Sequence, residues 1–376
     1  MVDLHGQYLK IKNEVDVAIE EVINTTSFIN GSIVKEFAKN MADYLGAVHV
    51  IPCANGTDAL QVAMMAFDLQ PGDEVITTPF TFIATAEVIA LLKLKPVFVD
   101  VDPDTFNMDV LQIEQKITPK TKAIVPVHLF GQCCDMQPIM SIAEKHGLYV
   151  IEDNAQAIGA DYCYDDCRLQ KAGTIGHIGC TSFFPSKNLG CYGDGGALFT
   201  NDDEIADRIS MIVNHGMKIR YYHDMIGVNS RLDSIQAAVL HVKLQHLDEY
   251  IDARQNAADH YSSKFAASPF LQIPFVAPYT NHVFHQYTLK TKDVDRDGLH
   301  QHLLEKSIPN AIYYPLSLHL QKAFENSGFE KGDFPVTESL CKSVISLPMH
   351  TELDTEQLDY ICTTLLDYVN TKNNKK

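Results

Sequence analysis

The sequence has 376 residues, and its 30 Lys and Arg against 48 Asp and Glu give a formal net charge of −18. Such an acidic chain repels phosphate backbones, and no apolar run approaches the roughly 20 residues that cross a bilayer, so neither a nucleic acid nor a membrane is expected as a partner. The length exceeds what one hydrophobic core usually serves and therefore predicts two domains.

The nine cysteines are scattered along the chain, without a Cys-x-x-Cys pair and without the Cys/His spacing that is typical of zinc sites. This usage predicts reduced thiols in a cytoplasmic protein, and no metal site.

The first two thirds of the chain alternate short β-branched runs with helical patterns. The predicted strands are Val48–Pro52, Glu74–Thr78, Lys95–Val99, Ala123–Val127, Tyr149–Asp153, Cys180–Phe184 and Gly196–Thr200. The predicted helices are Ile33–Leu45, Asp58–Phe67, Ala84–Leu92, Asp109–Ile117, Met136–His146 and Asp203–Asn214. Strands that alternate with helices predict an α/β fold with a mostly parallel sheet and helices on both faces.

From Asp233, a plausible N-cap, the pattern becomes helical through about Ala267. The remainder mixes predicted strands with predicted helices, at Tyr287–Lys290, Ala311–Tyr314, Asp295–Lys306 and Thr355–Tyr368. We therefore expect a large domain at residues 1–250, whose first residues could pack on the other domain, and a smaller C-terminal α/β domain at residues 251–376.

Asn55-Gly56-Thr57 follows a predicted strand and opens a predicted helix. A helix N-terminus offers free N–H groups and a partial positive charge that suit a phosphate, and Gly56 permits close approach of the backbone. Taken alone, such a segment is more often an ordinary helix cap.

Asp153 ends an apolar strand, at the edge where open α/β sheets bind ligands. Its carboxylate could pair with a protonated ring nitrogen and so keep the ring an electron sink. The alternative is an aspartate that only caps a helix.

Lys187 lies in a short turn between two apolar strands, with Ser182 and Ser186 nearby in the sequence. A lysine near a desolvated site can lose its proton and attack a carbonyl, and the serine hydroxyls could bind a phosphate. The alternative is a solvated loop lysine.

The polar and aromatic segment from Asn214 to Asp233 gathers Lys218, Arg220 and Arg231. Such a loop could reach an anionic ligand or a partner subunit, or could be an exposed hairpin.

Taken together and in this order, these segments resemble the DegT/DnrJ/EryC1/StrS family of sugar aminotransferases. The resemblance covers Asp3 to about Leu365. It rests on Asn55-Gly56-Thr57, Glu152-Asp153, Gln156, Ser182-Phe183-Phe184-Pro185-Ser186-Lys187, Gly193-Asp194-Gly195-Gly196 and Ser230-Arg231-Leu232-Asp233. It implies the fold-type-I architecture of transferases that depend on pyridoxal 5'-phosphate (PLP), and a homodimer with shared active sites.

The resemblance also implies roles for single residues. Lys187 would hold the cofactor and move the proton, and Asp153 would pair with the pyridine nitrogen. Gln156 would approach the ring hydroxyl and Phe82 would stack on the ring. The phosphate would be bound by Gly56, Thr57 and Ser182, and by Asn229 of the other subunit.

For the substrate, the resemblance implies a ping-pong transfer of an amino group from glutamate to a nucleotide-linked keto-sugar, for bacterial surface polysaccharide or a related amino-sugar pathway. The first choice is a UDP-linked 3-keto-N-acetyl uronic acid, whose carboxylate could bind Arg231 in a bidentate pair. Arg231 could instead only order its own loop. Tyr313 and Tyr314 are expected to line the sugar site, although many relatives have His-Tyr-Pro where this chain has Tyr313-Tyr314-Pro315.

Three alternatives remain. The substrate could be a dTDP-linked 3- or 4-keto-6-deoxy sugar. A sugar dehydratase on the same fold would replace the cofactor lysine by histidine, whereas this chain keeps Lys187. A non-catalytic regulatory protein would not need the lysine, aspartate and phosphate-binding set.

Overall fold

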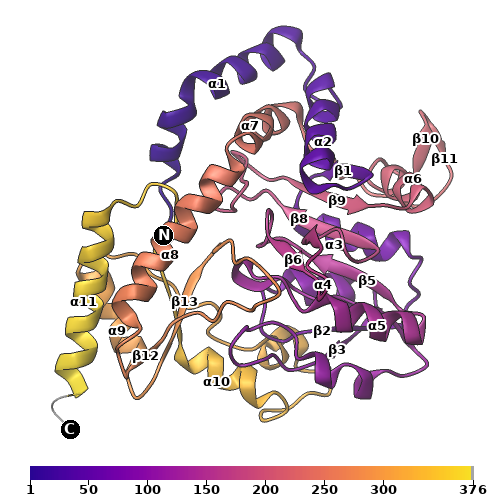
Figure 1. The fold of residues 1–376 in the computed structure, drawn as a ribbon. Coiled ribbons are helices and arrows are strands. Elements are labelled where there is room, and N and C mark those ends of the chain that lie inside the picture. Colours follow the sequence, from indigo (N-terminus) through magenta and orange to yellow (C-terminus); the bar gives the residue numbers. More distant parts are fainter. Residues whose placement is uncertain (374–376) are drawn as a thin grey trace.

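The computed structural model describes residues 1–373. Residues 374–376, the end of the second predicted domain, lie outside the described residues. Figure 1 shows a central sheet between layers of helices, with helix α8 leading from it toward helices α9 and α11. No helix within residues 1–373 is both long and apolar enough to span a lipid bilayer.

Seven strands form the central sheet in the order β1-β9-β8-β5-β4-β2-β3. They are β1 His49–Cys53, β2 Glu74–Thr77, β3 Lys95–Phe98, β4 Thr121–Ile124, β5 Tyr149–Asp153, β8 Ile178–Ser182 and β9 Gly196–Thr200. Neighbouring strands are parallel from β8 through β3, whereas β9 is antiparallel to both β8 and β1. The prediction of a mixed, mostly parallel sheet is confirmed.

Helices cover both faces of this sheet because successive strand residues point to opposite sides. Val150 packs in one apolar core and Ile151 in the other. The core around Val150 is covered by α2 Ser32–Leu45, α5 Met136–His146 and α7 Ser234–Leu244. The opposite core is covered by α3 Gly56–Ala66, α4 Ala84–Leu91 and α6 Asp203–Ile212.

The C-terminal part of the chain builds its own apolar core around a three-stranded antiparallel sheet. Its elements are α8 Leu247–Phe265, β12 Leu271–Gln272, β13 Tyr287–Thr291, α9 Arg296–Glu305, α10 Pro335–Ser343, β14 Val344–Leu347 and α11 Thr355–Asn373. The predicted domain boundary at residue 250 falls within the first turn of α8, and it stays a prediction.

Helix α1, Leu4–Thr25, packs Ile11 and Val15 against Val239 of α7. At the start of the chain, the carbonyl of Met1 accepts a hydrogen bond from the N–H of Met349 (3.2 Å). The first residues therefore contact the segment that follows β14.

The remaining elements are short. Two are hairpins, β6 Asp161–Cys163 with β7 Leu169–Lys171, and β10 Met217–Ile219 with β11 Tyr222–His223. The others are single 3-10 turns at Val110–Gln112, Glu114–Lys116, Leu129–Gly131, Leu318–Leu320 and Lys322–Phe324.

Two sequence predictions are wrong. The helix expected at Asp109–Ile117 is a pair of 3-10 turns, since Ile113 is its one fully buried apolar residue and Leu111 is 87% exposed, too little burial to stabilise an α-helix. The strand expected at Ala311–Tyr314 is a single bridge from Ala311 to Ser346, because the chain then turns its tyrosines toward a cavity.

Candidate active site

A cavity of about 430 Å³ opens where the parallel strands end. Asp153 is the last residue of β5 and Ser182 the last of β8, so the cavity lies at the edge where open α/β sheets bind ligands. Its lining comes from Asn55, Gly56, Thr57, Leu60, Thr81, Phe82, Ala84, Val127, Phe130, Asp153, Ala155, Gln156, Ser182, Phe184, Ser186, Lys187, Asp194, His285, Gln286, Tyr313 and Tyr314. The volume suits a small cofactor or ligand.

The N-terminus of α3 forms one end of the cavity. Asn55 caps this helix, because its side-chain oxygen accepts a hydrogen bond from the N–H of Asp58 (2.8 Å). A Cβ on Gly56 would lie 2.6 Å from the Cβ of Ser182, so only glycine lets the first turn of the helix lie against β8. The remaining N–H groups of this turn and the hydroxyls of Thr57 and Ser182 can bind an anion.

Asp153 is 5% exposed. Its carboxylate accepts hydrogen bonds from the hydroxyl of Thr85 (2.8 Å) and from the N–H of Ala155 (3.2 Å). Burial raises the pKa of Asp153, while these two hydrogen bonds and the positive charge of Lys187 oppose the rise. A cationic group in the cavity would satisfy this carboxylate.

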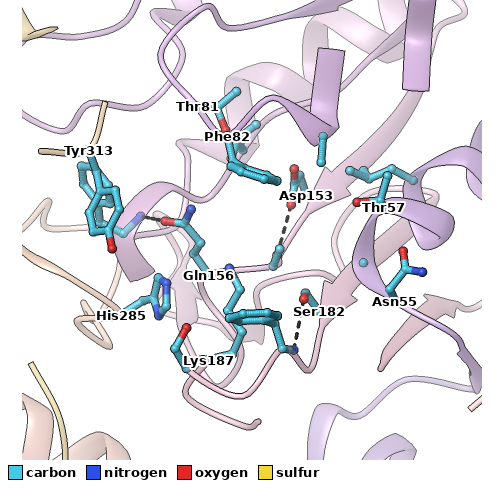
Figure 2. A pocket seen from close by; sticks show the side chains of 18 of the residues that line it. Asn55, Thr57, Thr81, Phe82, Asp153, Gln156, Ser182, Lys187, His285 and Tyr313 are labelled. Atoms are coloured by element: carbon cyan, nitrogen blue, oxygen red, sulfur yellow. Dashed lines mark hydrogen bonds between the residues drawn. The ribbon is translucent and has the colours of Figure 1, made fainter. Parts of the chain in front are cut away.

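Lys187 projects into the same cavity from the turn between β8 and β9 (Figure 2). The turn is fixed by a hydrogen bond from the N–H of Lys187 to the carbonyl of Phe184 (2.8 Å) and by one from Asn188 Nδ2 to the carbonyl of Val283 (2.9 Å). Among the described residues, no hydrogen bond or ion pair engages Lys187 Nζ. The surrounding protein desolvates the ammonium and lowers the pKa of Lys187 to about 8, and the charge of Asp153 opposes this shift.

Gln156 and Tyr314 form a hydrogen-bonded wall opposite α3. The side-chain oxygen of Gln156 accepts the N–H of Phe130 (2.7 Å), and its nitrogen donates to the Tyr314 hydroxyl (3.2 Å). Tyr313 lines the cavity beside them, and Phe82, which is 56% exposed, lies across it (Figure 2). The structure thus brings together nine of the predicted site residues, namely Gly56, Thr57, Phe82, Asp153, Gln156, Ser182, Lys187, Tyr313 and Tyr314.

Asn229 and Arg231 do not line the cavity of their own chain. Asn229 is exposed and bridges to Asn214, and Arg231 is half-buried. Within residues 1–373, no ion pair engages Arg231. The segment that carries both residues follows the exposed β10–β11 hairpin, while its Ser230 and Leu232 are buried.

The sequence analysis missed His285 and Gln286, which line the cavity from the C-terminal part of the chain. His285 is buried, and burial, together with the charges of Lys187 and Arg254, holds its pKa well below the usual range. The polar pair His285-Gln286 between Phe284 and Tyr287 was the available signal, but its distance in sequence from Lys187 concealed that the two segments meet at the cavity. Phe130 was missed for the same reason.

Comparisons with known proteins agree on one family. The DegT/DnrJ/EryC1/StrS aminotransferase family model matches residues 9–366. The chain is 46% identical over 370 residues to a protein named pleiotropic regulatory protein from Geobacillus stearothermophilus, and the match covers 98% of each chain. It is 45% identical to a UDP-2-acetamido-2-deoxy-3-oxo-D-glucuronate aminotransferase from Pseudomonas aeruginosa, over 97% of this chain and 98% of the other. A dTDP-3-amino-3,4,6-trideoxy-alpha-D-glucose transaminase from Streptomyces venezuelae is 38% identical, over 95% and 92%.

Solved structures give the same result. A DegT DnrJ EryC1 StrS aminotransferase from Brucella abortus has a TM-score of 0.92 and 42% identity, and the match covers 98% of each chain. The structure of ntda from Bacillus subtilis with bound cofactor pmp has a TM-score of 0.87 and 30% identity, over 96% of this chain and 82% of the other.

Proposed function

This chain belongs to the DegT/DnrJ/EryC1/StrS aminotransferase family of PLP-dependent sugar aminotransferases, and on that premise we propose its substrates, its residue roles and its assembly. The amino donor is glutamate, and the acceptor is a UDP-linked 3-keto-N-acetyl uronic acid. The two half-reactions follow a ping-pong order, in the cytoplasm, for surface polysaccharide or related amino-sugar synthesis. The nine cysteines are all free, which suits a reducing compartment.

The cavity fits the cofactor. A desolvated lysine and a buried carboxylate face one space, and a helix N-terminus lies at its far end. The lysine suits the aldehyde of the cofactor, the carboxylate suits the ring nitrogen, and the helix N-terminus suits the phosphate. Lys187 would hold the cofactor, Asp153 would pair with the ring nitrogen, and Gln156 would approach the ring hydroxyl. The remaining contacts are stacking by Phe82 and phosphate binding by Gly56, Thr57, Ser182 and the Asn229 of a second copy of this chain. When bound, the pyridine ring supplies an electron sink for the carbon that loses its proton.

Lys187 is the group that moves the proton. A lysine whose pKa lies near 8 is partly neutral at physiological pH, so its amine could accept and return the proton of the substrate carbon. The negative charge of Asp153 would keep the ring nitrogen protonated.

The proposal of a uronic acid substrate rests on Arg231, which is half-buried and has no ion pair within residues 1–373. A planar guanidinium can bind both oxygens of a carboxylate. The relative named UDP-2-acetamido-2-deoxy-3-oxo-D-glucuronate aminotransferase supports this substrate class. In a dimer with shared sites, Arg231 would reach the sugar in the partner's cavity.

The test compares kcat/KM for the uronic acid with that for its neutral 6-deoxy counterpart, in the wild type and in Arg231→Ala. We expect the wild type to prefer the uronic acid, and Arg231→Ala to lose roughly 10- to 100-fold with that substrate alone. The matched control is Arg220→Ala in the same loop, where the guanidinium lies over the ring of Tyr221. A wild type that prefers the neutral sugar, or an Arg231→Ala that loses equally with both, contradicts the assignment.

A dTDP-linked keto-6-deoxy sugar is the second candidate, favoured by the transaminase from Streptomyces venezuelae. The same assay tests it, because this substrate lacks the carboxylate. A relative also bears the name pleiotropic regulatory protein. Borohydride reduction followed by peptide mapping tests whether PLP binds at Lys187, and release of 2-oxoglutarate from glutamate separates an enzyme from a protein without catalysis.

A further inference from the structure

Glu152 and His128 form a polar pair beneath the active site, and both side chains are completely buried. Glu152 precedes Asp153 on β5, so the two carboxylates point to opposite faces of the sheet. The side chain of Asp153 enters the cavity, whereas that of Glu152 lies on the face that α2, α5 and α7 cover. Glu152 does not line the cavity.

The Glu152 carboxylate is fully satisfied by four donors. One oxygen accepts hydrogen bonds from His128 Nε2 (2.8 Å) and from the N–H of Gly173 (2.8 Å). The other accepts the N–H groups of Ile175 (2.7 Å) and Gly176 (2.5 Å). A carboxylate bonded in this way fixes the turn that leads into β8, the strand that precedes Lys187.

His128 has a fixed tautomer. Its Nδ1 accepts the N–H of Cys134 (3.1 Å), so the ring proton lies on Nε2 and is donated to Glu152. The pair therefore bonds two segments, residues 128–134 and residues 173–176, to the strand that carries Asp153.

The same pair is connected to two residues of the cofactor site. The N–H of His128 donates to the carbonyl of Asp153 (3.0 Å), and the N–H of Asp153 donates to the carbonyl of Pro126 (2.9 Å). Two residues beyond His128, the N–H of Phe130 donates to the side-chain oxygen of Gln156 (2.7 Å). A shift of residues 128–130 would displace both Asp153 and Gln156.

We propose that Glu152 and His128 are positioning residues that hold Asp153 and Gln156 in the geometry that the cofactor ring requires. This inference rests on the roles proposed above for those two residues. The carboxylate and the imidazole do not touch the cofactor and act through the backbone of their own segments.

The test is Glu152→Gln, which keeps the size of the side chain. Its single oxygen can still accept from Ile175 and Gly176, but its NH2 group then meets the N–H of Gly173 and Nε2–H of His128, so donors face donors. We expect the dissociation constant of PLP, measured by absorbance titration of the apoprotein, to rise at least about tenfold, as for residues that orient a ligand's contacts. The pH midpoint of the bound cofactor's absorbance should shift as well.

The matched control is Glu74→Gln. Glu74 is also buried and accepts from Lys95 Nζ (3.0 Å) and the Thr118 hydroxyl (2.5 Å), but it begins β2, at the end of the strand opposite to the cavity. We expect this variant to lower the thermal midpoint and to bind PLP as the wild type does. If Glu152→Gln changes only the thermal midpoint in the same way, its role is merely structural and the proposal is overturned.

A second pair of variants decides the matter should Glu152→Gln fail to fold. His128→Phe removes both hydrogen bonds of the ring and should weaken PLP binding, whereas His128→Gln offers a donor and an acceptor and should retain most of it. Equal PLP affinity in both variants overturns the proposal. A wild type that does not bind PLP contradicts the proposed function instead.

Discussion

The reactivity of the active site depends on the protonation of one amine. Burial lowers the pKa of Lys187 from its ordinary 10.5 to about 8, because the charged form is the one that desolvation penalises. The neutral, nucleophilic fraction therefore appears at lower pH than in a free lysine, and grows as the pH rises through 8. The negative charge of Asp153 works in the opposite direction and raises the pKa of Lys187.

We expect the rate of PLP capture by the apoprotein to rise with pH, with a midpoint near 8. Asp153→Asn removes the charge that raises the pKa of Lys187, so its midpoint should lie lower. Stopped-flow absorbance measures the rate. Lys187→Ala is the control, and should keep the fold, capture no cofactor and lose turnover by roughly 10²- to 10⁴-fold or more. A midpoint near 10.5 would show a solvated lysine, and a folded Lys187→Ala with near-normal turnover would rule out the mechanism.

Asp153 should matter for turnover through its charge. In Asp153→Asn a neutral amide replaces the partner of the ring nitrogen, so we expect kcat to fall at least about 100-fold. Thr85→Val is a milder change at the same carboxylate, because it removes one hydrogen bond and keeps Asp153 itself. The hydrogen bond from Thr85 lowers the pKa of Asp153, so its loss should raise that pKa and move the acid limb of kcat/KM to higher pH. A mild effect of Asp153→Asn with PLP still bound would mean that the side chain of Asp153 only caps the backbone N–H of Ala155.

At the scale of elements, the sequence predicted the helices and strands whose apolar residues recur within a short stretch of the chain. The strands of the central sheet alternate between two cores and therefore stand out as apolar runs, as Tyr149–Asp153 does. The sequence pattern did not predict helix α1, because this helix buries few apolar side chains and these lie against α7. Strand β14 was not predicted either, because its pairing with β13 joins residues far apart in sequence.

The same limit applies to the active site. Motifs next to the strand ends, such as Asp153 and Lys187, could be found from sequence, whereas His285 reaches the cavity only through tertiary packing. Arg254 holds that segment, since its guanidinium donates to the carbonyls of Phe284 (3.2 Å) and His285 (3.4 Å). A buried arginine that bonds carbonyls leaves no short motif in the sequence.

Helix α10 depends on a residue far away in the sequence. The carboxylate of Asp100, 3% exposed, accepts the N–H groups of Val336 (2.9 Å) and Thr337 (2.9 Å) and the hydroxyl of Thr337 (2.7 Å). We expect Asp100→Ala to lower the free energy of unfolding by about 1–3 kcal/mol, because these donors would stay buried and unpaired. α10 also packs in the cluster that contains Tyr313 and Tyr314, so the KM for the sugar should rise.

Chemical denaturation and steady-state kinetics measure these two effects. The control is Asp202→Ala, which removes the cap of α6, where the exposed carboxylate accepts the N–H of Ile205 (2.9 Å). It should cost about 1 kcal/mol and leave KM unchanged. Equal KM values for the two variants would show that α10 does not support the sugar site.

At the scale of the whole molecule, the loop that carries β10 and β11 exposes several large apolar side chains. Ile219, Tyr221, Tyr222 and Ile226 are 67%, 75%, 70% and 87% exposed. An exposed apolar group of this kind commonly marks a protein interface. Asn229, proposed to bind the phosphate, lies in the same loop and outside its own cavity, so a shared site requires a second copy of the chain that faces this one.

Hybrid dimers test this arrangement. In a dimer of Lys187→Ala with Asn229→Ala, one site carries both lesions, and the other combines the intact Lys187 of one subunit with the intact Asn229 of its partner. Two variants that are nearly inactive alone should therefore regain activity when they are mixed under conditions of subunit exchange. Random reassociation of equal amounts makes half of the dimers hybrid with one intact site each, so about a quarter of the wild-type activity should return. Native mass spectrometry counts the hybrids, and a mixture of each variant with itself is the control. If well-formed hybrids stay inactive, Lys187 and Asn229 serve the same subunit's cavity, and the loop must fold back onto its own chain to reach the phosphate.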